Sequence, residues 1–144
     1  MAIKNLNPYV FFSGNAAEAL KFYEKTLGAK VDGLMQFGDV KDAPGGPEDK
    51  HRVMHALVKL GDAAIMVSDV MPGQNASTVS NVEICLDFDT VEDLLQKFDA
   101  LSAGGKVIMA PHDTFWGAKF GTLKDKFNIH WMFNCQVTDP NLRK

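Results

Sequence analysis

The chain repeats one order of secondary-structure patterns, and this repeat limits the fold more than any other feature. In residues 6–37 a strand pattern is followed by a helix pattern, a glycine and another strand pattern, and the same order returns in 81–110. The residues that follow the two predicted helices are also similar: Gly28-Ala-Lys-Val31 after the first and Gly105-Lys-Val107 after the second. Each copy then continues into an apparent β-hairpin. We therefore predict an α+β fold of tandem βαβββ modules that form a curved mixed sheet around a cleft.

Start and stop signals mark the two helices. Asn15 with Glu18 three residues later is typical of a helix N-terminus, and Gly28 is typical of a C-terminus. Thr90 is the predicted cap of the second helix, whose apolar residues recur at helical spacing until Gly104-Gly105. Each helix is therefore expected to bury one apolar face against a sheet.

The repeat also predicts the domain organisation. We expect one domain over residues 1–144, with a first module at 1–69, a linker at 70–80, a second module at 81–135 and a C-terminal tail at 136–144. The Gly- and Pro-rich stretch 38–50 reads as a long loop to which the sequence assigns no role. The predicted strands are 6–13, 29–37, 51–60, 63–69, 81–88, 106–110 and the two arms of a hairpin at 113–135.

Composition excludes several classes of function. The formal net charge is −3 and there is no run of Lys and Arg, so nucleic acid is not an expected partner. No apolar run is long enough to span a membrane, and the N-terminus lacks the pattern of a signal peptide. Cys85 and Cys135 read as reduced thiols within strands. We therefore expect a cytoplasmic protein.

Strand alternation places one set of side chains on the sheet face away from the helices. This set is moderately polar, aromatic or sulfur-bearing, which is the composition of a small-molecule pocket. Exposure to water or to a dimer partner is the alternative interpretation. The predicted ligand-binding residues on this face are Tyr9, Phe11, Met66, Ser68, Glu83, His130 and Met132.

Four further observations concern chemistry. His55 and His130 are the candidate catalytic residues because imidazole can move a proton near neutral pH, although a structural role is the alternative for each. His55 is also a predicted ligand-binding residue. Phe115 and Trp116 are expected either to pack in the core or to cover a flat ligand. The basic side chains of the predicted hairpin at 113–135, which are Lys119, Lys124 and Lys126, are too scattered to predict an anion site.

Three segments resemble a known family. They are PYVFFSGNAAEALKFYEKTLGA at 8–29, MHALVKLGDAAIMVSD at 54–69 and DTFWGAKFGTLKDKFNIHWMFN at 113–134. The chain resembles the PhnB-like group of the glyoxalase/bleomycin resistance/extradiol dioxygenase (vicinal oxygen chelate) superfamily. The resemblance implies the βαβββ duplication, a small-molecule ligand and a homodimer. The methyltransferase label that some members carry is not supported, because Gly45-Gly46 and Gly104-Gly105 lack a nucleotide-binding context.

Members of this superfamily usually bind a divalent metal through four side chains. The corresponding positions here supply almost no oxygen or imidazole donors, so we predict no metal and no cofactor. Two alternatives stay open: a metal-dependent lyase or dioxygenase with a displaced site at His55, Glu83 and His130, and a dimerising binding or resistance protein without catalysis. The corresponding positions are Pro8 or Tyr9, Met66 or Ser68, Asn81 or Glu83, and Met132.

Overall fold

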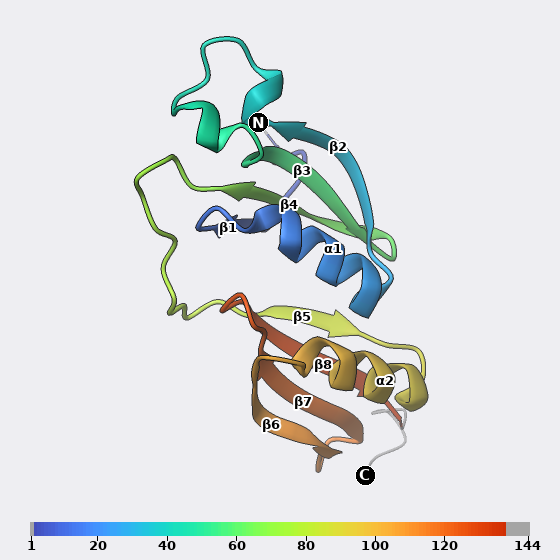
Figure 1. Cartoon of the computed structure of the whole chain (residues 1–144). Coiled ribbons are helices and arrows are strands. Elements are labelled where there is room, and N and C mark those ends of the chain that lie inside the picture. Colours follow the sequence, from blue (N-terminus) through green and yellow to red (C-terminus); the bar gives the residue numbers. More distant parts are fainter. Residues whose placement is uncertain (1, 138–144) are drawn as a thin grey trace. The chain divides into compact units, whose positions relative to one another are not determined.

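A computed structural model describes residues 2–137 of the chain (Figure 1). The chain divides into two compact units, Met1–Ala76 and Ser77–Lys144, and the described part of each is an α+β module with one α-helix and a four-stranded mixed sheet. The α+β class and the tandem βαβββ pattern predicted from the sequence are therefore confirmed. The single domain, the exact module bounds and the cleft stay predictions, and most of the predicted tail, from residue 138 on, lies outside the described residues.

The first unit places its strands in the order β1-β4-β3-β2. Strand β1 pairs in parallel with β4, whereas β2–β3 and β3–β4 are antiparallel. The two-residue turn at Gly61 and Asp62 connects β3 to β4, as the sequence predicts. The elements are β1 (Tyr9–Phe12), α1 (Ala16–Leu27), β2 (Lys30–Gln36), β3 (Val53–Leu60) and β4 (Ala63–Asp69), with two short 3-10 helices, η1 (Phe37–Asp39) and η2 (Pro47–Asp49), between β2 and β3.

Helix α1 packs on one face of this sheet (Figure 1). Its buried face includes Leu20 and Tyr23, and the sheet contributes the fully buried Ala56, Val58 and Val67. Burial of each large apolar side chain stabilises the fold by roughly 1.5–3 kcal/mol. Among the described residues of this unit, no α-helix packs on the opposite face of the sheet, which carries those predicted ligand-binding residues that belong to the first unit.

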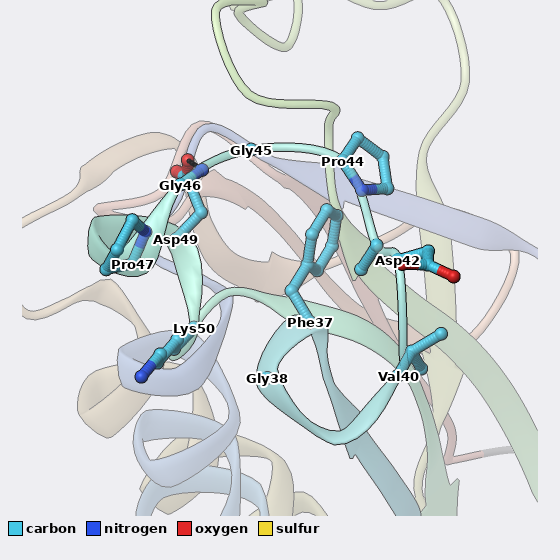
Figure 2. A pocket seen from close by; sticks show the side chains of 11 residues that line it. Phe37, Gly38, Val40, Asp42, Pro44, Gly45, Gly46, Pro47, Asp49 and Lys50 are labelled. Atoms are coloured by element: carbon cyan, nitrogen blue, oxygen red, sulfur yellow. Dashed lines mark hydrogen bonds between the residues drawn. The ribbon is translucent and has the colours of Figure 1, made fainter.

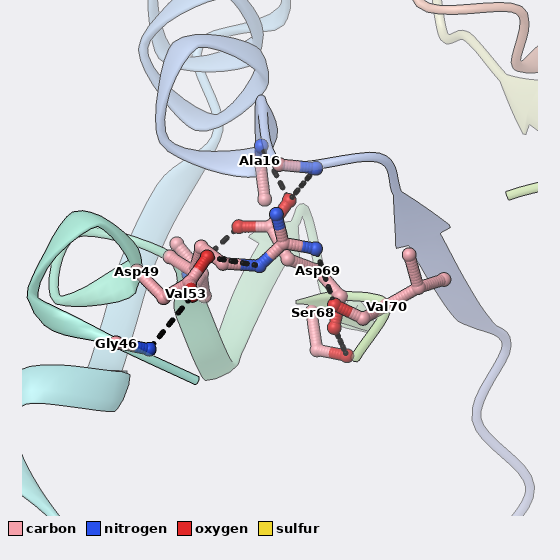
Figure 3. Close-up of polar contacts among 9 residues, drawn as sticks. Ala16, Gly46, Asp49, Val53, Ser68, Asp69 and Val70 are labelled. Atoms are coloured by element: carbon pink, nitrogen blue, oxygen red, sulfur yellow. Dashed lines mark hydrogen bonds and ion pairs between the residues drawn. The ribbon is translucent and has the colours of Figure 1, made fainter. Parts of the chain in front are cut away.

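The N-terminus of α1 differs from the sequence prediction in its cap. Asn15 precedes the helix, but its side chain makes no capping hydrogen bond within the described part of the chain. Instead Asp69, at the end of β4, accepts hydrogen bonds from the backbone N–H groups of Gly14 (2.8 Å), Ala16 (3.0 Å) and Val53 (2.7 Å) (Figure 3). A distant carboxylate therefore accepts from the first N–H of the helix, that of Ala16, and joins the helix start to β3 through Val53.

The second unit repeats this topology with the order β5-β8-β7-β6. Strand β5 pairs in parallel with β8, and β6–β7 and β7–β8 are antiparallel. The hairpin predicted at 113–135 is therefore confirmed as β7 and β8. The elements are β5 (Ile84–Asp87), α2 (Val91–Ser102), β6 (Lys106–Asp113), β7 (Ala118–Lys124) and β8 (His130–Gln136).

The core of the second unit is built between α2 and the buried residues of β7 and β8. Phe98 of α2 meets the ring of Phe133 edge-on, with 5.1 Å between the centroids. Trp131 is fully buried, and its indole Nε1–H donates to Asp125 Oδ2 at 2.9 Å. The same carboxylate accepts from the N–H groups of Phe127 (2.8 Å) and Ile129 (3.1 Å), so it closes the β7–β8 turn.

Several strand ends differ from the sequence prediction. Strand β1 begins at Tyr9 and β5 at Ile84, so Val82, which belongs to the predicted strand 81–88, lies outside β5 and is 69% exposed. Strand β6 continues past Pro111, where we expected it to end. It is an edge strand, and a proline is tolerated there because its missing N–H interrupts no inner ladder. Among the described residues, no helix has the length and apolar character needed to span a bilayer.

Candidate binding surfaces

The open face of the first unit carries an exposed pair of aromatic rings. Tyr9 and Phe11 alternate along β1 and are opposite Met66 and Ser68 of β4. Their rings stack at 4.9 Å with an interplanar angle of 15°, and they are 42% and 49% exposed. An exposed aromatic stack on a rigid strand offers a flat apolar surface to a ligand.

A polar pair lies beside this stack. Tyr9 Oη is 3.2 Å from His55 Nδ1, which comes from β3. Because the imidazole tautomer decides which atom donates, the pair can present either a donor or an acceptor. A phenol hydrogen-bonded to an imidazole also offers a path for a proton. The structure therefore brings the predicted Tyr9, Phe11 and His55 together on one face.

The two other predicted residues of this face differ in accessibility. Met66 is half-buried beside Tyr9. Ser68 is only 5% exposed, and its hydroxyl donates to the carbonyl oxygen of Asp69 at 3.2 Å (Figure 3). Ser68 therefore offers a ligand little accessible surface, and its hydroxyl is already engaged.

The corresponding face of the second unit has a different chemistry. Cys85 is opposite Met132, and Asn134 Nδ2 donates to Asp87 Oδ1 at 2.9 Å across the same strands. Partial burial, together with the carboxylates of Asp87 and Glu83, raises the pKa of the Cys85 thiol above its ordinary value. The thiol is therefore protonated at neutral pH, which argues against a nucleophilic role.

The remaining predicted residues of the second unit separate into two groups. Glu83 is exposed just before β5, and His130 begins β8, close to Met132. The His130 Nε2 atom is buried and has no hydrogen-bond partner among residues 2–137. Phe115 and Trp116 lie between β6 and β7, at the opposite end of β7 from His130.

Phe115 and Trp116 form the tip of the β6–β7 connection. Phe115 is 86% exposed and meets Trp116 edge-on at 4.9 Å. Trp116 in turn lies 6.0 Å from the ring of Phe120. Phe115 therefore does not pack in the core of its unit, and the alternative of an aromatic cover stays a prediction.

The residues at the superfamily's metal positions do not fit a divalent cation. Two of them, Met66 and Met132, offer thioether sulfur, whereas hard cations require oxygen or imidazole donors. Throughout residues 2–137, no group of three or more His, Cys, Asp and Glu side chains gathers in a way that could hold a metal ion.

The loop between β2 and β3, for which the sequence predicts no role, forms a hollow of about 280 Å³ (Figure 2). Phe37 is 4% exposed and forms part of its wall. Asp39 and Asp49 fix the two short 3-10 helices by accepting from the N–H groups of Gln36 (2.9 Å) and Gly46 (3.1 Å). The Gly and Pro content of this loop was the available signal, but it indicated only irregular structure.

The two βαβββ modules, each with a four-stranded mixed sheet and one α-helix, define the class of fold. Within that class, residues 5–133 match the model of the Glyoxalase/Bleomycin resistance protein/Dioxygenase superfamily. The chain belongs to this superfamily, as the resemblance in the sequence implied.

Individual relatives extend over almost the whole chain. Protein YjdN of Escherichia coli (strain K12) is 36% identical, and the match covers 94% of this chain and 97% of that protein. The crystal structure of PA1353 from Pseudomonas aeruginosa has a TM-score of 0.82 at 34% identity, covering 94% of this chain and 100% of that one.

A third relative agrees in fold at lower identity. The Bacillus cereus structure described as "Putative 3-demethylubiquinone-9 3-methyltransferase, PhnB protein" has a TM-score of 0.77 at 22% identity, with coverage of 92% and 99%. The activity named in that description concerns that protein, and the likeness supports the fold alone.

Proposed function

We propose that this chain is a PhnB-like protein that binds a small, partly apolar molecule on the open sheet face of the first unit. Binding does not use the divalent metal that is usual in the superfamily. The observation that carries the proposal is the hydrogen bond between Tyr9 Oη and His55 Nδ1 beside the exposed Tyr9–Phe11 stack. The rings provide apolar contact area, and the polar pair orients one hydroxyl, amine or carbonyl group of the ligand.

The same geometry suits a proton transfer, but it does not require one. His55 is held by Tyr9, so a bound hydroxyl or an acidic carbon near the imidazole would be in reach of a general base. A metal-dependent lyase or dioxygenase is the weaker candidate because the donor set is poor. Metal analysis of purified protein tests this alternative, and about one equivalent of divalent metal lost in His55→Ala would favour it over our proposal.

The binding proposal is tested with 2-naphthol, a flat apolar probe with one hydroxyl group. Its dissociation constant is measured by ligand-observed NMR for the wild type, Tyr9→Ala, His55→Ala and the control His51→Ala, which changes an exposed loop histidine. We expect the first two variants to weaken binding about tenfold, equivalent to 1.4 kcal/mol. Equal affinity in all four proteins, or no binding to the wild type, would contradict the proposal.

We further propose a homodimer, as the family resemblance implies. An exposed apolar stretch on edge strand β6 favours this interpretation: Val107, Ile108 and Met109 are 45%, 53% and 46% exposed. A second copy would shield this edge from further pairing. Sedimentation equilibrium at micromolar concentration should give twice the chain mass of 15.8 kDa, and a monomer would overturn the assembly but not the ligand proposal.

A further inference from the structure

A row of basic side chains crosses three strands of the second unit. Lys106 of β6 is opposite Lys124 of β7, and Lys124 is opposite His130 of β8. Residues directly opposite each other in antiparallel strands point to the same side of the sheet, with neighbouring Cβ atoms. The row therefore lies on the side opposite to the buried Leu123 and Trp131, which face the core under α2.

The two lysines have no counter-ion in the described part of the chain. The ion pairs of residues 2–137 include neither Lys106 nor Lys124, although Lys124 is half-buried. The nearest acid in sequence is Asp125, and its carboxylate is occupied by Phe127 N–H, Ile129 N–H and Trp131 Nε1–H. Like charges directly opposite each other destabilise a sheet, so this arrangement has a cost that an anion would remove.

The first unit shows how such a pair is neutralised. Lys30 and Lys59 are the first residue pair of β2 and β3, just as Lys106 and Lys124 are the first pair of β6 and β7. There Asp32 Oδ2 lies 3.5 Å from Lys59 Nζ. Asp32 is opposite Leu57, two residues before Lys59.

The second unit has the cations without this acid. In the second unit the position that corresponds to Asp32 is the one opposite Thr122, because Thr122 precedes Lys124 by two residues as Leu57 precedes Lys59. Met109 occupies this position. A thioether cannot balance a charge. In place of the acid, the row continues into His130, whose buried Nε2 lacks a hydrogen-bond partner among the described residues.

We propose that Lys106, Lys124 and His130 form a binding site for a small multiply charged oxyanion of the phosphate class. Two ammonium groups neutralise the charge, and the imidazole contributes one further hydrogen bond in the tautomer or protonation state that carries Nε2–H. A dianion is preferred to a monocarboxylate because it interacts with both lysines. This site lies in the other unit from Tyr9 and His55, and it does not depend on the function proposed for them.

The test is a titration of the full chain with inorganic phosphate at low ionic strength, followed by NMR. Lys124→Gln should weaken phosphate binding at least about tenfold. The matched control is Lys119→Gln, which removes the same charge from the same strand, but at a lysine that already pairs with Asp113 (Nζ–Oδ1, 3.0 Å). It should leave the affinity within about twofold of the wild type, and circular dichroism checks the fold of each variant.

A second variant supplies the missing acid. Met109→Asp copies the arrangement of Asp32 in the first unit, at a side chain that is 46% exposed, and should abolish phosphate binding without removing a cation. Lys106→Gln replaces Lys124→Gln if the latter does not fold. Equal losses in Lys119→Gln and Lys124→Gln, unchanged binding in Met109→Asp, acetate binding as tightly as phosphate, or no phosphate binding to the wild type would each overturn the proposal.

Discussion

In the described part of the chain, each unit contains a buried aspartate that accepts at least three hydrogen bonds, and the two carboxylates join very different parts of the chain. Asp69 of the first unit is 4% exposed and binds Gly14, Ala16 and Val53, which are 55, 53 and 16 residues away. Asp125 of the second unit is 2% exposed, and its partners are two, four and six residues away. One carboxylate connects distant segments, whereas the other closes a local turn.

This difference shows that equivalent helices of one topology can have the free N–H groups of their first turn satisfied in two ways. In the second unit Thr90 Oγ1 accepts from the N–H of Asp93 at 3.2 Å, so α2 is capped by its own neighbour. In the first unit the side chain of Asn15 makes no such bond, and Asp69 accepts from the N–H of Ala16 instead. Stability of the first unit should therefore depend on one long-range contact, while that of the second unit is divided between two local ones.

The largest expected effect comes from the two aspartates. We expect Asp69→Ala to lower the free energy of unfolding by about 4 kcal/mol, because three backbone donors lose a charged acceptor and two of the three bonds are fully buried. Asp125→Ala should cost less, about 3 kcal/mol, because two of its donors are only partly buried and can turn to water. Urea unfolding measures both.

Matched controls sharpen this comparison. Asp69→Asn and Asp125→Asn retain one acceptor oxygen and should recover part of the loss. If Asp125→Ala were more destabilising than Asp69→Ala, the long-range carboxylate would not be the more important of the two.

A smaller effect distinguishes the two helix caps. Thr90→Ala should destabilise by about 1 kcal/mol because it removes the capping hydrogen bond to Asp93. Asn15→Ala removes no such bond and should change stability by less than about 0.5 kcal/mol. Thermal unfolding of both variants gives the comparison, and a larger loss in Asn15→Ala would contradict the assignment of the cap to Asp69.

The smallest effect concerns Cys85. Burial and the charges of Asp87 and Glu83 raise the pKa of this thiol, so the thiolate fraction at pH 7.5 should be below that of an ordinary cysteine and alkylation should be slow. Asp87→Asn removes one negative charge, lowers the pKa and should increase the alkylation rate by about threefold. The rate is followed from pH 7 to 10 in a Cys135→Ser background.

An unchanged rate profile in Asp87→Asn would show that the neighbouring carboxylate has no influence on Cys85. In the first unit, Tyr9 and Phe11 of β1 occupy the positions that Cys85 and Asp87 occupy in β5 of the second unit. The open faces of the two sheets would then differ in side-chain packing but not in electrostatics.

Local signals in the sequence predicted the helices well. The helical spacing of apolar residues and the glycine at Gly28, which adopts φ 68°, fixed the ends of α1 correctly. The βαβββ repeat predicted the class of fold for the same reason, because its evidence is contiguous in the chain. The hairpin of β7 and β8 followed from a polar interruption between two apolar runs.

What the sequence could not provide were contacts between distant residues. Asp69 read only as the end of a strand, because its partners at the helix terminus are more than 50 residues away. Lys124 appeared scattered among other lysines, because only the ladder register places it opposite Lys106 and His130. The pairing of Tyr9 with His55 was hidden for the same reason, although both residues were assigned to a ligand.

The position of Asp69 also sets an order in time. During synthesis the N-terminus of α1 is complete 53 residues before the carboxylate that satisfies the N–H of Ala16 is made. At the usual rate of translation this is a delay of roughly 3 to 10 s. Helix α2 meets its cap as it emerges, since Thr90 precedes Asp93 by three residues. The module that is made first must therefore wait for its last strand, whereas the second can begin to fold from its first turn of helix.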